Sequence, residues 1–267
     1  MSTNTIAVVK RGAIARITLD RPRHGNAIDG GVLRGLADAC AAIAADDGVR
    51  VAVLTAGGDV FSTGWDWSAL GGLAGVSPAG LAEALSFRGR TLGDPFRCLA
   101  ELPKPVVCAV NGDAIGGGLA LALACDIRIA AEGARFGLPE TALGLLPLGG
   151  ALQRLARVAG RGTALEMALT GEEIDAPAAL RCGLVSSVVP ASGGLLAEAD
   201  AIAGRIAERG PLALQYAKEA VSRGIDMPLE QALRYETDLT IILQTTEDRA
   251  EGVRAFLEKR SPRFKGR

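Results

Sequence analysis

The chain has 267 residues and a formal net charge of −1, from 29 basic and 30 acidic side chains. This balance argues against a nucleic-acid-binding surface and against electrostatic attachment to an anionic membrane. Hydrophobic residues make up 49% of the sequence and charged residues 22%, which is typical of a globular protein with a large buried core.

Apolar runs predict the strands of the first two thirds of the chain, and a 3.6-residue apolar period predicts its helices. In chain order, strands are expected at 14–19, 49–55, 105–110, 127–131, 135–137 and 184–189, and helices at 30–45, 119–124, 150–160, 162–170 and 176–182. A Gly- and Ala-rich loop at 68–80 leads into a further predicted helix that reaches about residue 102. Asp94-Pro95 is expected to interrupt that helix.

The pattern changes after residue 191, where helices follow one another without strands. They are expected at 193–209, 211–223, 228–245 and 247–259. The sequence therefore predicts an α/β body over 1–191 and a helical region over 192–267. The apolar residues of the helix after Pro228 predict either an oligomer interface or ordinary intrachain packing.

Several classes of protein are excluded by what the sequence lacks. No basic N-terminal stretch precedes a long apolar segment, and Asn111, Asp113 and Asp126 interrupt the apolar run near 106–129. We therefore expect a cytoplasmic protein without a signal peptide or a membrane span. The five cysteines form no C-x-x-C pair, which predicts small buried apolar residues rather than a disulfide or metal framework.

The single histidine, His24, lies in the polar turn RPRHGNA, and no G-x-S-x-G motif accompanies it. Multi-histidine metal sites are therefore excluded, and a catalytic triad has at most one candidate base. We expect His24 to be a solvent-exposed loop residue.

The segment AVNGDAIGGGLALALACD (109–126) joins a predicted buried strand to a predicted helix through three consecutive glycines. Glycine allows a sharp turn and the close approach of another molecule. The first N–H groups of the helix lack intrahelical acceptors, so they could bind an oxygen that becomes negative during a reaction. The glycines could equally serve to pack the helix on the sheet, and the residues alone leave both interpretations open. The spacing does not fit a dinucleotide-binding fingerprint.

Four segments, in register, resemble the crotonase (enoyl-CoA hydratase/isomerase) family, and so does the tail FLEKRSPRFKG (256–266). The four are LDRPRHGNAI (19–28), VLTAGGDVFSTGWDW (53–67), AVNGDAIGGGLALALACDIRIA (109–130) and FGLPETALGLLPLGGALQRLARVAG (136–160). The resemblance implies an α/β fold, a spiral of β-β-α units with the CoA and acyl site, followed by a C-terminal helical oligomerisation region. It also implies a homotrimer or a dimer of trimers.

The resemblance further implies an acyl-CoA thioester substrate, with coenzyme A as part of that substrate and no separate cofactor. Family members stabilise a thioester enolate with two backbone N–H groups, which correspond here to those of Trp65 and Gly117. Donors that are already in position where negative charge develops make a weak carbon acid reactive.

One departure from the family pattern bears on the type of reaction. Family hydratases use two glutamates; the second corresponds to Glu140, but the first corresponds to Ala120, and Leu148 stands where some relatives have an aspartate. A single carboxyl with a pKa raised by burial suits proton transfer near neutral pH. The pattern favours an isomerase-like proton shift over efficient hydration, unless Glu83 or Glu101 replaces the missing base. The alternatives are a Glu140 that caps a turn and a homologue that binds acyl-CoA without catalysis.

Trp65 is the second departure, because family members usually have alanine there. Its indole either narrows the acyl pocket or packs on the neighbouring loop beside Trp67. Asp66 is expected to fix this loop, and Arg23 to contact a phosphate, since a guanidinium binds phosphate oxygens bidentately. Arg23 and Lys259, which could reach the CoA of a neighbouring subunit, could instead be solvated surface charges. The residues expected along the substrate are Arg23, Ala27, Ser62, Asp66, Leu148 and Lys259.

Overall fold

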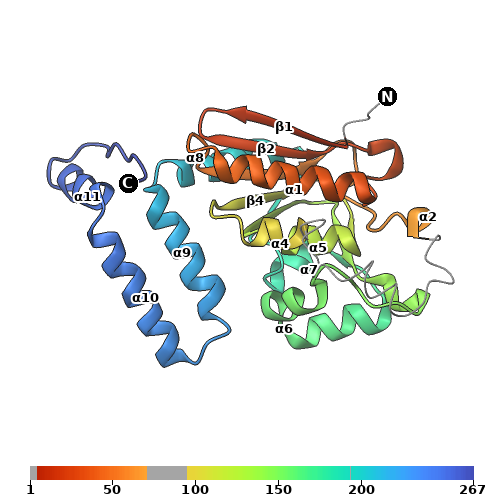
Figure 1. Ribbon diagram of the computed structural model, residues 1–267. Helices are drawn as coiled ribbons and strands as arrows, with labels where there is room; N and C mark the ends of the chain where they lie inside the picture. Colours follow the sequence, from red (N-terminus) through yellow and green to blue (C-terminus); the bar gives the residue numbers. More distant parts are fainter. Residues whose placement is uncertain (1–4, 71–94, 193) are drawn as a thin grey trace.

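The computed structural model of the chain describes residues 5–70, 95–192 and 194–267. Its centre is a six-stranded sheet with the order β1-β2-β3-β4-β6-β9 (Figure 1). These strands are β1 (Ile6–Arg11), β2 (Ile14–Leu19), β3 (Val51–Ala56), β4 (Val106–Val110), β6 (Ile127–Ala131) and β9 (Ser187–Val189). β1 and β2 form an antiparallel hairpin, whereas every following pair is parallel. Parallel neighbours need long crossover connections, which explains the helices between them.

The two faces of the sheet are covered by different helices. Alternate residues of β3 separate them: Ala52 and Leu54 pack in the cluster that contains α1 (Gly30–Ala45) and α5 (Gly117–Leu123). Val51 and Val53 pack in a second cluster with Ala199 and Ala203 of α8 (Leu195–Ala207). This two-residue alternation is the normal consequence of a pleated strand buried on both sides.

A small second sheet, β5 (Ala114–Ile115), β7 (Arg135–Gly137) and β8 (Ile174–Asp175), lies beside the N-terminal end of α5. The remaining helices are α2 (Trp67–Leu70), α4 (Pro95–Ala100), α6 (Ala151–Thr170), α7 (Ala176–Arg181), α9 (Pro211–Gly224), α10 (Leu229–Gln244) and α11 (Glu247–Leu257), with 3₁₀ helices η1 (Pro22–His24) and η3 (Pro139–Leu143). The mixed α/β fold with its C-terminal helices confirms the fold class that the sequence predicts.

Most predicted elements are present, and the differences have local causes. β1, β5 and β8 have no counterpart among the predicted strands: β1 is an edge strand whose Val8 and Val9 are exposed, and the other two are only two residues long. The helices predicted at 150–160 and 162–170 form one kinked helix, α6, in which Gly160 leaves helical geometry. Of the predicted 68–102 segment, residues 71–94 lie outside the described residues. Residues 68–70, predicted as loop, belong to the short helix α2, and α4 lies within the predicted helix.

The helices after residue 192 differ from one another in how they pack. α8 covers the sheet and belongs to the body, whereas α9 and α10 form a pair that projects from it in Figure 1. α10 exposes the apolar side chains Leu229, Leu233, Ile241 and Ile242. Its role as an oligomer interface stays a prediction. Across the described ranges, no helix combines the length and apolar character needed to cross a bilayer.

Candidate active site

The backbone at Trp65 runs beside Ile28, and this pairing directs its polar groups. Ile28 N–H donates to Gly64 O at 2.7 Å, and Asp66 N–H donates to Ile28 O at 3.0 Å. In a parallel bridge of this kind, the residue between the two bonded ones presents its N–H on the opposite side. Among the described residues, the Trp65 N–H meets no hydrogen-bond acceptor.

Buried polar contacts hold this backbone in place. Asn26 is almost fully buried, and its Nδ2 donates to two carbonyls of the 57–60 segment at 2.9 and 2.7 Å. The Arg21 guanidinium pairs with Asp29 at 3.0 Å and with Asp66 at 3.5 Å. Because these contacts join two segments far apart in sequence, the Trp65 N–H is positioned by the tertiary structure rather than by its own loop.

Gly117, the first residue of α5, supplies a second free donor. The first N–H groups of a helix have no intrahelical acceptor, and that of Gly117 has none among the described residues. A Cβ built on Gly64, whose φ is +93°, would lie 3.2 Å from Gly117 N and 2.8 Å from Ile115 O. Only glycine therefore lets the segment before Trp65 come this close to the start of α5.

Glu140 lies beside these donors because β5 and β7 are parallel neighbours. Gly116 N–H donates to Gly137 O at 2.9 Å, so the chain after each strand leaves the small sheet at the same edge. A Cβ built on Gly116 would lie 2.5 Å from Oε1 of Glu140. Glu140 is 2% exposed, and neither of its carboxyl oxygens has a hydrogen-bond partner in the described part of the chain.

Burial raises the pKa of Glu140 above its usual value, and no charged group of the described residues contributes to the shift. The surroundings are apolar. Ala120, one turn after Gly116 on α5, is fully buried, and its N–H donates to Gly116 O at 3.0 Å. In the described part of the chain, neither carboxyl oxygen has a partner that would cap the turn.

The indole of Trp65 lies within this site. A Cβ built on Gly117 would be 3.2 Å from its Nε1 and 3.3 Å from its Cε2. The ring also packs against Phe96 of α4, with centroids 5.7 Å apart at 54°. Trp67 is 40% exposed and makes no ring contact with Trp65 in the described structure. The indole therefore lies over the start of α5 rather than beside Trp67.

Residues 10–267 of the chain match the family model described as Enoyl-CoA hydratase/isomerase. The chain belongs to this family. It is 40% identical over 262 residues to the 2,3-dehydroadipyl-CoA hydratase of Escherichia coli, which covers 98% of this chain and 99% of the relative. It is 41% identical to the (E)-benzylidenesuccinyl-CoA hydratase of Thauera aromatica, over 95% of this chain and 96% of the relative. The enoyl-CoA hydratase structure from Bacillus anthracis superposes with a TM-score of 0.90 at 39% identity, over 98% and 100% of the two chains. The family resemblance of the sequence is thus confirmed.

Within this crotonase-family fold, the other predicted contact residues differ in availability. Ser62 is fully buried; its Oγ donates to Asn26 O at 2.9 Å and accepts from Gly64 N at 3.2 Å. Asp66 pairs with Arg21 and accepts a hydrogen bond from Ser68 Oγ at 2.5 Å. Both side chains thus have contacts that fix the loop before α2, and Ser62 has no exposed surface for a direct substrate contact.

The remaining predicted residues lie around the loops or far from them. Arg23 and His24 are exposed in η1, as expected for His24, and Ala27 is buried with its carbonyl accepting from Arg21 Nη1 at 2.6 Å. Leu148 is half-buried against the core. Lys259 is exposed just after α11, at the opposite end of the molecule from α2 in Figure 1. Its contact with the CoA of a neighbouring subunit stays a prediction.

The two glutamates considered as replacement bases have different outcomes. Glu101 is exposed and accepts a hydrogen bond from Arg97 Nε at 2.8 Å, so its carboxyl faces solvent rather than the buried Glu140. Glu83 lies outside the described residues. The sequence analysis did not identify Gly64 or Phe96 as residues of the site. The positive φ of Gly64 could not be predicted from the sequence beyond the presence of a glycine.

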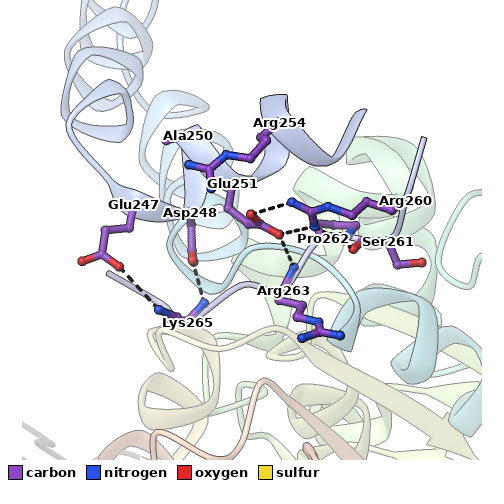
Figure 2. A pocket seen from close by; sticks show the side chains of 10 residues that line it. All are labelled: Glu247, Asp248, Ala250, Glu251, Arg254, Arg260, Ser261, Pro262, Arg263 and Lys265. Atoms are coloured by element: carbon purple, nitrogen blue, oxygen red, sulfur yellow. Dashed lines mark hydrogen bonds and ion pairs between the residues drawn. The ribbon is translucent and has the colours of Figure 1, made fainter. Parts of the chain in front are cut away.

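A pocket of about 720 Å³ lies between α11 and the C-terminal tail (Figure 2). Its charges are used internally: Arg260 pairs with Glu251 at 2.6 Å, and Asp248 accepts from the N–H of Lys265 at 2.6 Å. The hydrogen bond from Arg260 lowers the pKa of Glu251 to about 2. These contacts fasten the tail that follows Lys259 to α11.

The buried carboxyl makes a prediction about stability. We expect Glu140→Gln to be more stable than the wild type at pH 8, with a difference that shrinks toward pH 4. Since the folded pKa of Glu140 is raised, its favourable contribution is complete below the unfolded pKa of about 4.3 and is lost as pH rises through the folded pKa. Each unit of elevation corresponds to about 1.4 kcal/mol. Urea unfolding across this range measures the difference, with Glu101→Gln as the exposed control. A free-energy difference that does not change with pH would contradict the prediction.

Proposed function

We propose that the protein is an enzyme that acts on an acyl-CoA thioester. The N–H groups of Trp65 and Gly117 bind the thioester oxygen, and Glu140 transfers a proton at the adjacent carbon. The observation that carries this proposal is a buried carboxyl beside two backbone donors, all without hydrogen-bond partners among the described residues. The family membership supports the same substrate class, and so do the two relatives described above, which are hydratases of CoA esters.

The proposed chemistry follows from these groups. The ionised Glu140 takes a proton from the α-carbon, and the electron pair moves toward the thioester oxygen. The two N–H groups stabilise the negative charge as it forms, in surroundings where water is excluded and electrostatic interactions are strong. The raised pKa makes Glu140 an effective base that can also return the proton.

A 1,3-proton shift needs no second carboxyl. For a 3-enoyl thioester, the proton leaves C2, the double bond moves to C2–C3, and the same carboxyl delivers the proton to C4. Hydration in this family pattern uses a further carboxyl to activate water, and Ala120 stands in its place. We therefore propose isomerase-like chemistry as the preferred reaction, with weaker hydration.

The decisive comparison uses one enzyme preparation and two substrates. The rate of crotonyl-CoA hydration is measured beside the rate of isomerisation of 3-hexenoyl-CoA to the 2-enoyl thioester. A larger kcat/KM for isomerisation is expected. Hydration at the rate of an efficient hydratase, with negligible isomerisation, would contradict the proposed preference.

Restoring the missing carboxyl should increase hydration. In Ala120→Glu, a carboxyl would stand one helical turn from Gly116, opposite a site that already contains Glu140. We expect crotonyl-CoA hydration to rise at least about tenfold, since a positioned general base contributes 10²- to 10⁴-fold when its geometry is ideal. Ala120→Gln is the matched control, because glutamine has nearly the same volume as glutamate but cannot act as a general base. Equal hydration by the two variants would contradict the argument.

One observation favours a second candidate function, a homologue that binds acyl-CoA without catalysis. The Trp65 indole lies within van der Waals distance of the Gly117 side of the site, and it could exclude a reacting acyl group. This candidate predicts binding of butyryl-CoA without exchange of its α-hydrogens in D₂O. Measurable exchange by the wild type would eliminate it.

A further inference from the structure

The indole N–H of Trp65 is a buried donor without an acceptor. Trp65 is 7% exposed, and its Nε1 has no hydrogen-bond partner in the part of the chain that the structure describes. An indole nitrogen is always a donor and never a base. Burying such a group without a partner costs folding free energy, so native proteins nearly always provide an acceptor for it. The acceptor of Trp65 is therefore to be sought outside the described chain.

The position of Nε1 relates it to the backbone donors. In an α-helix, the Cα–Cβ direction tilts toward the N-terminus, which is also the direction of the N–H groups. Nε1 lies 3.2 Å from where a Cβ of Gly117 would be, so the indole nitrogen lies directly beside this first residue of α5. Ile28 Cδ1 lies 3.0 Å from the same point, and the Phe96 ring packs on the indole.

Three donors for which the described residues provide no acceptor thus lie near the start of α5, and two of them belong to one residue. They are the N–H of Gly117, the backbone N–H of Trp65 and the indole N–H of Trp65. The buried carboxyl of Glu140 on the other side of Gly116 bonds to none of them. If an oxygen bound to the two backbone N–H groups became negative, a further hydrogen bond from the Trp65 indole N–H would stabilise its charge.

We propose that the Trp65 indole N–H is a third hydrogen-bond donor to the thioester oxygen of a bound acyl-CoA. This inference rests on the proposed function of the same site. No bond is made or broken at Trp65. Its hydrogen bond strengthens as negative charge develops on the oxygen, which makes Trp65 a catalytic residue through its side chain as well as its backbone.

The wild-type protein allows a direct test, because it contains only two tryptophans. Its ¹H–¹⁵N spectrum should show two indole signals, and the one that is lost in Trp65→Phe belongs to Trp65. Saturating butyryl-CoA should move the Trp65 indole proton downfield, as expected when a new hydrogen bond forms. Free CoA, which lacks the thioester carbonyl oxygen, should leave this proton signal in place. An equal response to both ligands, or none to butyryl-CoA, would overturn the proposal.

Kinetics of Trp65→Phe supply an independent readout. The variant keeps an aromatic ring against Phe96 and the backbone N–H, but it has no indole N–H. We expect kcat for α-hydrogen exchange of butyryl-CoA to fall about 10- to 100-fold, as for the loss of one hydrogen bond to a charged group. The dissociation constant of free CoA should change little. Unchanged kcat would refute the third donor, and a change in KM alone would indicate a shape effect instead.

Different results would contradict the proposed catalytic function and the third hydrogen-bond donor. If the wild type binds butyryl-CoA but exchanges no α-hydrogen, the proposed catalytic function is wrong, and the indole shift still reports whether Trp65 contacts the thioester. If the wild type is active and Trp65→Phe equals it, the function stands and the third donor is wrong.

Discussion

Replacing Glu140 by glutamine should reduce the exchange of α-hydrogens of butyryl-CoA in D₂O by about 10³-fold, within the range that a positioned general base contributes. Glutamine has nearly the same shape and fits the same buried space, but it cannot take a proton. The loss should appear in kcat, because neither carboxyl oxygen makes a contact in the described chain whose removal would rearrange the site. NMR or mass spectrometry of the recovered thioester measures the exchange.

Two controls make this result specific to Glu140. Binding of free CoA to Glu140→Gln should match the wild type, which shows that the site remains formed. Glu101→Gln should retain activity, because Glu101 is exposed and paired with Arg97. Exchange by Glu140→Gln within tenfold of the wild type would mean that another group is the base, and loss of exchange in Glu101→Gln would identify that group.

The second large effect is expected for Gly116→Ala. Gly116 has φ +53° and ψ −118°, a conformation that alanine adopts only with strain. The new Cβ would also lie 2.5 Å from Oε1 and 3.2 Å from Cδ of Glu140, so the carboxyl must move. Displacing a catalytic group by about 1 Å can cost about 10²-fold in rate, and we expect at least that loss in kcat/KM.

Gly12→Ala separates displacement of the carboxyl from backbone strain. Gly12, in the hairpin between β1 and β2, has φ +59°, but a Cβ there meets no atom within 4 Å. Both variants should lose stability, by about 1–2 kcal/mol from the left-handed backbone alone, yet only Gly116→Ala should lose activity. Thermal unfolding and the exchange assay provide the two measurements. Similar activity of the two variants would show that Glu140 does not depend on the space at Gly116.

Local patterns were sufficient for elements whose own residues specify them. The apolar period of α1 and the buried runs of β4 and β6 predict these elements, because each presents one continuous apolar signal. β1 escapes prediction because most of its side chains face solvent, and β5 and β8 because two residues carry no period. α8 resembles the later helices in sequence, and only its contact with the sheet assigns it to the body.

By itself, the sequence determined the α/β class, the family, and the identity of Glu140, Gly117 and Trp65 as the residues to consider. The class follows from the apolar patterns, and the three residues follow from the resemblance of four segments to the crotonase family. The tertiary structure decided that Gly64 brings the two backbone donors together, that Glu140 is buried without a partner, and that the indole of Trp65 lies over Gly117. The reason is that burial and hydrogen-bond partners depend on contacts between segments far apart in the sequence, which local residue patterns do not specify.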